Sequence, residues 1–340
     1  MNELLDRAVI LDVPDVGPAT LIKNQPPDWS DIFSTTTITA DELQKLPVIP
    51  REPILGEWFR KGDLGFIFAP RGVGKTWLGT LFAHAIATGG EAGPWKAPKP
   101  WRVLYVDGEM ALDLTKQRHR ALSPTPNENL MFLHHEVVFQ RTGKVLNLTL
   151  PLVQESLLQH AVANKIEVVI LDNLSCLFSG VSENEADAWE QVLPWLLQLR
   201  RHGIAVVFIA HAGRNGLMRG TSRREDAAVW ILSLSEPAET SIIPGAHFVA
   251  RFTKCRNTPS QDAPTLEWHF QREGADGVKV NWTVADPLLI FRGWIEEGLN
   301  TCSDLAAEMT LSKGQISKLA RRAQKAGWLN IKKRQYFLVT

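Results

Sequence analysis

One stretch decides the fold: Leu64-Gly65-Phe66-Ile67-Phe68-Ala69-Pro70-Arg71-Gly72-Val73-Gly74-Lys75-Thr76. It begins with an apolar run typical of a buried strand and continues into a glycine-rich turn. It ends in Gly-Lys-Thr, directly before a helical run over residues 77–88. This order is the context of a phosphate-binding P-loop, in which glycines let backbone N–H groups face phosphate oxygens at a helix N-terminus. We therefore predict that residues 69–76 bind a nucleotide.

Two side chains of this loop have separate predicted roles. Lys75 would reach the β- and γ-phosphates of ATP, and Thr76 would offer its hydroxyl to Mg²⁺. The usual pattern opens with glycine where this chain has Ala69. Alanine suits that place if the backbone needs no positive φ there. The alternative is an ordinary strand, turn and helix with a surface lysine.

The composition limits the class of protein without naming a partner. The 340 residues allow one large domain or two ordinary ones, and 37 basic against 37 acidic residues give no net charge. Cys176, Cys255 and Cys302 lie far apart in the sequence, which fits a reducing cytoplasm better than a disulfide framework. We find neither a signal-peptide pattern nor an apolar run of about 20 residues. We expect a cytoplasmic protein with no membrane segment.

Residues 166–172 form a second diagnostic run, which is β-branched, apolar and ends in Asp172. Such a run is typical of a strand buried on both faces of a parallel sheet. An acid at this place is a Walker B pattern, and Asp172 would hold Mg²⁺ beside Thr76. The alternative is that Asp172 caps a following helix.

Two further candidates stand just past the ends of short apolar strands. Glu109 follows the run over residues 102–107, and ligands of open α/β sheets bind outside the carboxyl ends of strands. A carboxylate there can orient or deprotonate a water, although Glu109 could instead belong to the start of a helix over residues 110–122. His211 follows the run over residues 204–210 and would contact the γ-phosphate or be structural.

The segment over residues 212–224 is rich in glycine and arginine. It would contact a nucleic-acid backbone, reach an ATP across a subunit boundary, or form a solvated loop. Its arginines are Arg214, Arg219, Arg223 and Arg224. Runs over residues 229–234, 247–254 and 266–271 predict shorter strands, and Lys254 and Arg256 are spaced to lie on one face.

The C-terminal part differs in charge from the rest. Residues 303–340 contain eight Lys and Arg against two Asp and Glu, in a pattern of short helices followed by a strand pair. This pattern resembles a winged helix-turn-helix, whose usual target is duplex DNA, although such modules also bind proteins. The exposed side of its second helix and its basic turn would contain Lys313, Gln315, Ser317, Lys318, Arg322, Lys332, Lys333 and Arg334.

The predicted organisation has three parts. Residues 1–46 form an N-terminal arm, which would be mobile or would dock on a neighbouring subunit. Residues 47–285 form an α/β core with a mostly parallel sheet flanked by helices. Residues 286–340 form the small winged-helix-like domain.

Residues 36–285 resemble RecA-like P-loop ATPases, and among them the hexameric replicative helicases of the RepA plasmid type, related to DnaB. The resemblance lies in an ordered set of motifs. These are the P-loop, residues 105–109, Leu171-Asp172, His211, residues 219–226 and residues 252–257.

The resemblance implies a homo-oligomeric ring, a hexamer, with ATP between subunits. Lys75, Thr76, Glu109 and Asp172 would act in cis. An arginine finger would come from the neighbour, either Arg219 or Arg256, with Lys254 assisting. Residues 179–185 and 214–224 would face single-stranded DNA in a central channel, although the first of these loops is acidic.

Two function classes remain open at this stage. The first is an ATP-hydrolysing DNA motor, a ring-forming replicative helicase of a plasmid, phage or mobile element. The second is a DNA-bound ATPase regulator or loader that changes assembly state with ATP and does not translocate. A RecA-like recombinase is a third option. Strand displacement on forked DNA separates the first from the others.

Overall fold

The computed structural model of the protein describes residues 29–123, 125, 127–179, 186–212, 222–237, 244–259, 262–274, 277–309 and 311–339, without the side chains of residues 186–191 and 222–224. The chain divides into two units, residues 1–50 and 51–340. In the first, α1 (Trp29–Thr36) and α2 (Ala40–Lys45) have no buried residue. Thr39 and Glu42 form a capping box at the start of α2, as their spacing of three residues predicts.

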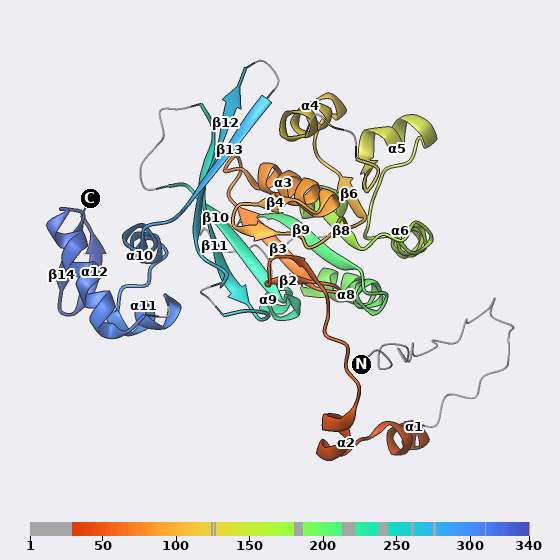
Figure 1. The fold of residues 1–340 in the computed structure, drawn as a ribbon, viewed down its shortest axis with the longest axis horizontal. Helices are drawn as coiled ribbons and strands as arrows, with labels where there is room; N and C mark the ends of the chain where they lie inside the picture. The colour runs from red at the N-terminus through yellow and green to blue at the C-terminus, as the bar shows by residue number, and fades with distance from the viewer. Residues whose placement is uncertain are drawn as a thin grey trace, which may run out of the picture. The chain divides into compact units, whose positions relative to one another are not determined.

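The second unit is built on one sheet of nine strands in the order β13-β12-β11-β10-β3-β9-β8-β6-β7 (Figure 1). Six of them are parallel: β3 (Leu64–Ala69), β6 (Val103–Asp107), β7 (Leu130–His134), β8 (Val168–Asp172), β9 (Ala205–His211) and β10 (Trp230–Ser235). Three antiparallel strands extend this half: β11 (Gly245–Cys255), β12 (Leu266–Glu273) and β13 (Gly277–Val284). The predicted α/β class with a mostly parallel, RecA-like sheet is confirmed.

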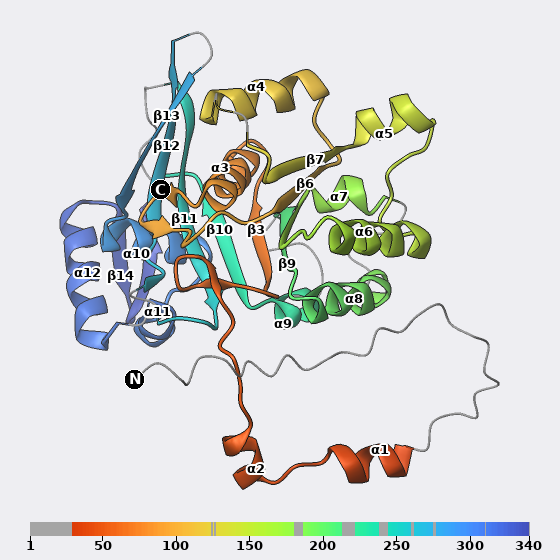
Figure 2. The same cartoon turned by 45° about the vertical axis from the view of Figure 1, so that its right-hand side comes forward.

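Successive residues of the central strands enter two different cores. In β3, Ile67 and Ala69 belong to the core under α3 (Lys75–Thr88). Phe66 and Phe68 belong to the opposite core, under α6 (Pro151–Ala163) and α8 (Ala186–Arg201). Figure 2 shows α3 and α4 (Leu112–Leu122) over one face of the sheet, with α6, α7 (Leu174–Leu177) and α8 over the other. Burial on both faces explains why β3, β6 and β8 are continuously apolar up to their last residue.

Short elements complete the second unit around a cluster of aromatic rings. They are β1 (Pro53–Leu55), β2 (Phe59–Arg60), β4 (Glu91–Ala92) and β5 (Trp95–Lys96). A further short helix, α9 (Ser222–Ala227), packs through Ala227 against the opposite core. Trp58, between β1 and β2, lies 4.8 Å from Trp230 and 4.9 Å from Phe252 between ring centroids. The β1–β2 hairpin is thereby packed against β10 and β11.

The C-terminal elements surround a hydrophobic cluster of their own. They are α10 (Pro287–Glu296), α11 (Cys302–Glu308), α12 (Lys313–Lys325), β14 (Leu329–Lys332) and β15 (Gln335–Leu338). Thr301 forms an isolated bridge with Gln335 and so joins the helices to the hairpin. We refer to residues 287–339 as the C-terminal module. Its identification as a winged helix, and the domain boundaries at residues 46 and 285, stay predictions.

Two elements differ from the sequence-based expectation. By its pattern the apolar run over residues 131–138 predicts a single strand, but the strand ends at His134 and α5 (His135–Thr142) begins directly. Periodicity over eight residues does not separate a strand from a strand followed by a helical turn. The strand β13 was missed because its burial is only partial. Among the described residues, no helix is both long and apolar enough to cross a membrane.

Candidate active site

The P-loop connects the buried end of β3 to the first turn of α3. Gly72 has φ 83° and Gly74 has φ 131°, so both occupy backbone conformations that L-residues rarely adopt. A Cβ on Gly74 would also lie 2.5 Å from the Phe248 ring. Ala69 is not among the described non-glycine residues with positive φ, so alanine fits the place usually taken by glycine. The backbone can therefore turn its N–H groups toward a phosphate at the start of a helix of 14 residues.

Lys75 is held over the loop by the loop itself. Its Nζ donates hydrogen bonds to the carbonyl oxygens of Ala69, at 3.0 Å, and Pro70, at 2.8 Å. Burial lowers the pKa of Lys75 to about 8, while the charges of Asp172 and Glu109 oppose that shift. Because these contacts use only carbonyl groups, an anionic phosphate entering the loop would offer the ammonium a better partner.

Asp172 ends β8 and is only 2% exposed. Its Oδ2 accepts a hydrogen bond of 2.7 Å from the Tyr105 hydroxyl, and the nearby Thr76 side chain acts to lower the pKa of Asp172. Burial raises the pKa of Asp172 to about 6, although the Tyr105 hydrogen bond acts in the other direction. A divalent cation beside Thr76 would offset the cost of this buried charge, so the residues present fit the predicted Mg²⁺ site.

Glu109 lies on the nucleotide side of the strand ends. It does not cap α4, because the N-cap is Ala111 and makes no side-chain hydrogen bond. Its carboxylate accepts a hydrogen bond from Asn173 Nδ2 and lies 3.9 Å from His211 Nε2. Asn173 Nδ2 is also 3.2 Å from His211 Nε2. The structure thus brings the predicted residues Glu109 and His211 together through Asn173, and their catalytic roles stay predictions.

Asp107 is the acid that shapes the turn carrying Glu109. Its Oδ1 accepts hydrogen bonds from the backbone N–H groups of Glu109, at 3.1 Å, and Met110, at 3.0 Å. Its Oδ2 accepts a hydrogen bond of 2.7 Å from the Thr115 hydroxyl. In the sheet Asp107 is the register partner of Asp172. The turn is therefore fixed to β6 and α4. These hydrogen bonds position Glu109 through its backbone and leave its carboxylate out of the contacts with Asp107.

These groups border a cavity of about 420 Å³. Its wall also includes Trp77, Met110 and Arg118, with the Arg118 guanidinium 5.3 Å from the centre of the Trp77 ring. Sequence reasoning missed Tyr105, Asn173 and Arg118. For Asn173 a signal existed, since it directly follows the strand-ending acid; the other two depend on packing between distant elements.

Lys254 and Arg256 lie at the other end of the sheet. Since β11 is antiparallel to β10 and β10 is parallel to β3, the end of β11 lies beside the start of β3. Lys254 Nζ donates hydrogen bonds to the carbonyl oxygens of Glu225 and Asp226. Burial, and then the nearby charge of Arg256, lower the pKa of Lys254. β3 has six residues at ~3.3 Å each, which separates this end from the P-loop by about 17 Å or more.

The remaining predicted site residues divide into two groups. Arg214 and Arg219 lie outside the described residues, and the structure describes no side chain for Arg223 or Arg224. Lys313, Lys318 and Arg322 are exposed on α12, and Lys332, Lys333 and Arg334 are exposed in and beside the β14–β15 turn. Of the loop over residues 179–185, only Ser179 is described.

Comparison with known proteins gives a family for the core. A family model described as AAA domain matches residues 30–216, more than half of the chain. No curated protein sequence matches the chain. Among solved structures it is similar to the flagellar accessory protein FlaH from Methanocaldococcus jannaschii, at 13% identity and a TM-score of 0.43, over 65% of this chain and 90% of that chain. The range matched by the family model contains the P-loop, Glu109, Asp172 and His211.

Proposed function

This chain belongs to the AAA domain family of P-loop ATPases, and from that premise we propose that it is an ATP-hydrolysing DNA motor. In this proposal it is a ring-forming replicative helicase of a plasmid, phage or mobile element. It acts in the cytoplasm, uses ATP with Mg²⁺ and holds single-stranded DNA in a central channel.

The placement of charge at the two ends of the sheet is the observation on which the proposal rests. Lys75, Glu109 and Asp172 border one cavity at the carboxyl ends of the parallel strands. Lys254 and the exposed Arg256 lie about 17 Å or more away at the opposite end. Arg256 is therefore too far to contact a nucleotide on the P-loop of its own chain. In the proposed ring it would instead contact a nucleotide bound by a second copy.

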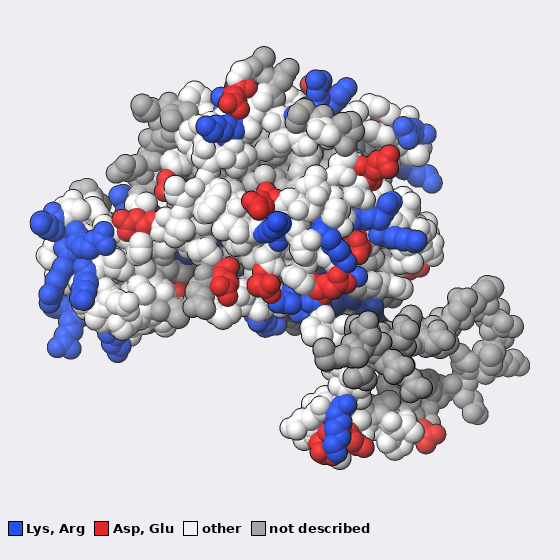
Figure 3. Space-filling view, in the orientation of Figure 1, with Lys and Arg blue, Asp and Glu red and all other residues white. Residues whose placement is uncertain are grey.

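The C-terminal module supports a role on DNA. Figure 3 shows basic side chains gathered over this module, on the left of the view. Exposed residues there include Lys313, Lys318, Arg321, Arg322 and Lys325 of α12. Such a surface fits the phosphate backbone of duplex DNA, whose binding depends strongly on salt.

ATP hydrolysis measured with and without single-stranded DNA tests the proposal first. We expect DNA to stimulate hydrolysis and ATP to drive strand displacement on forked DNA. Lys75→Ala should abolish hydrolysis and is the control for a contaminating ATPase. Robust hydrolysis without unwinding in either polarity would refute the motor.

A second candidate is favoured by the same basic module. A DNA-bound ATPase regulator or loader would use α12 to bind a duplex site and ATP to change its assembly state. It would hydrolyse ATP at a rate indifferent to single strands and would bind a specific duplex, so both measurements separate it from the motor.

A further inference from the structure

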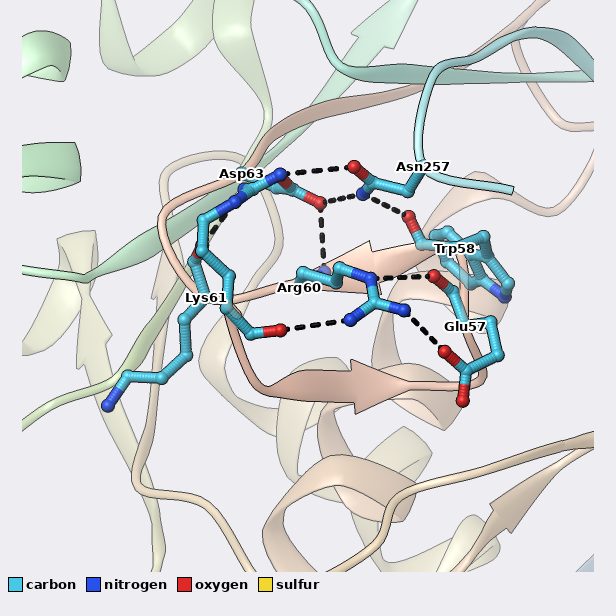
Figure 4. Close-up of polar contacts among 7 residues, drawn as sticks. Glu57, Trp58, Arg60, Lys61, Asp63 and Asn257 are labelled. Carbon is cyan, nitrogen blue, oxygen red and sulfur yellow. Dashed lines mark hydrogen bonds and ion pairs between the residues drawn. The ribbon is translucent and has the colours of Figure 1, made fainter. Parts of the chain in front are cut away.

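A buried polar network supports the backbone that carries Arg256. Asp63 immediately precedes β3, and its side chain has no exposed surface. Its Oδ2 accepts hydrogen bonds from the backbone N–H of Arg60, at 2.8 Å, and from Asn257 Nδ2, at 2.6 Å. Its Oδ1 is paired with Arg51. Figure 4 shows Asp63 and Asn257 facing each other between the β1–β2 hairpin and the end of β11.

Asn257 uses its whole side-chain amide in this network. Besides the bond to Asp63, its Nδ2 donates to the carbonyl oxygen of Trp58 at 2.8 Å, and its Oδ1 accepts from Arg51 Nη2 at 3.1 Å. These partners lie about two hundred residues earlier in the chain. Asn257 is therefore fixed from three directions, by the loop before β3 and by the hairpin next to it.

Arg256, one residue earlier, is held only through its backbone. Its N–H donates a hydrogen bond of 3.0 Å to the carbonyl oxygen of Val229. This is the last backbone hydrogen bond between this segment and the chain at the start of β10. Its side chain is exposed, and among the described residues none forms a hydrogen bond or an ion pair with it. A guanidinium that must reach a second chain therefore depends on the position of the backbone on both of its sides.

We propose that Asn257, held by Asp63 and Arg51, is a positioning residue for Arg256, so that the start of β3 sets where the finger points in the neighbouring subunit's site. The inference rests on the proposed function, because Arg256 needs a trans site to act on. A displacement of about 1 Å in a positioned group can cost on the order of 100-fold in rate.

Asn257→Ala in the full-length protein tests the inference. We expect kcat for ATP to fall by about tenfold or more, while binding of a fluorescent ATP analogue changes less than about twofold, since the P-loop of the same subunit is untouched. Asn164→Ala is the matched control, because within the described part of the chain the Asn164 side-chain amide bonds only to His160, four residues earlier in α6. It should keep the wild-type rate.

Mixed oligomers separate positioning from a general loss of structure. An Asn257→Ala subunit has an intact P-loop, and a Lys75→Ala subunit has an intact finger. Mixing them should restore hydrolysis at the shared interfaces. Mixing Asn257→Ala with Arg256→Ala should restore nothing, because neither has a working finger.

The results distinguish this inference from the proposed function. Suppose that Arg256→Ala loses turnover and that mixing it with Lys75→Ala restores hydrolysis. If Asn257→Ala then keeps the wild-type kcat, or if its activity is not restored by mixing with Lys75→Ala, only the inference is overturned. If Arg256→Ala keeps its turnover, the trans finger and the inference are both overturned. Should Asn257→Ala not fold, Arg51→Gln is judged by the same assays and the same outcomes. It removes the bond to Asn257 together with the ion pair to Asp63, at a side chain that is itself partly exposed.

Discussion

Replacing Asp172 with asparagine should make the protein more stable and inactive at once. The carboxylate is 2% exposed, and its burial raises its pKa from 3.8 to about 6. Compared with the unfolded chain, the folded state therefore makes ionisation of this carboxyl less favourable. Asparagine has nearly the same shape, can still accept the Tyr105 hydrogen bond, and has no charge to bury.

The raised pKa gives both the sign and the size of the effect. A change of this pKa from 3.8 to about 6 corresponds to roughly 3 kcal/mol of unfolding free energy between the fully protonated and the fully ionised limits. A group with a raised folded-state pKa contributes stability below its unfolded-state pKa and loses it as the pH rises through the folded-state value. At pH 7 the wild type has lost almost all of this contribution, and at pH 5 it regains about 1 kcal/mol.

Urea unfolding followed by tryptophan fluorescence, without nucleotide or Mg²⁺, measures this effect. The stability advantage of Asp172→Asn over the wild type should be about 1 kcal/mol smaller at pH 5 than at pH 7. Asp113→Asn, which removes an exposed carboxylate on α4, should show no such change. In the same preparations Asp172→Asn should lose Mg²⁺-dependent ATP hydrolysis. If the difference in unfolding free energy between Asp172→Asn and the wild type does not depend on pH, burial does not destabilise the ionised form of Asp172 and the reasoning is refuted.

Three further expectations concern other parts of the chain. Gly65→Ala should lower the unfolding free energy by about 1–3 kcal/mol or more in urea titrations, because the new Cβ would lie 2.0 Å from the Trp230 ring; an unchanged midpoint would contradict the packing of β3 against β10. Arg251→Ala removes the paired hydrogen bonds of 2.9 and 3.0 Å to Glu297 and should speed protease cleavage between β13 and α10; an unchanged cleavage rate would mean that this contact does not hold the C-terminal module. Lys318→Ala should weaken duplex binding and reduce its salt dependence by about one counterion; equal slopes in salt titrations would remove Lys318 from the interface.

The sequence predicted best what depends on local pattern. The apolar runs that end at Ala69 and Asp172 form strands buried on both faces of the sheet. A continuously apolar run is typical of such a strand in a parallel sheet. A polar residue at its end must then lie at the edge of the sheet, where ligands bind. The positions of Lys75, Glu109 and Asp172 around one cavity were therefore predictable from the motifs and their order.

What the sequence could not predict depends on register between distant strands. Tyr105 reaches Asp172 because β6 pairs with β8 in one particular alignment, with Asp107 opposite Asp172. A different register would place another side chain there, and no local pattern chooses between them. The contact of Asp63 with Asn257 is a stronger case, since its two residues belong to segments that only the folded sheet brings together.

The antiparallel extension of the sheet gives strand β3 two functional ends. Its last residue leads into the phosphate loop, and the residue before its first, Asp63, supports the segment that carries Arg256. All six residues of β3 are buried, so the close packing around the strand leaves it little freedom to bend. In a ring, each copy would then join its own nucleotide, at one end of β3, to the finger that it offers to the next copy at the other end. A change at one phosphate site would reach the neighbouring site through a rigid strand, which is the coupling that a motor with shared sites requires.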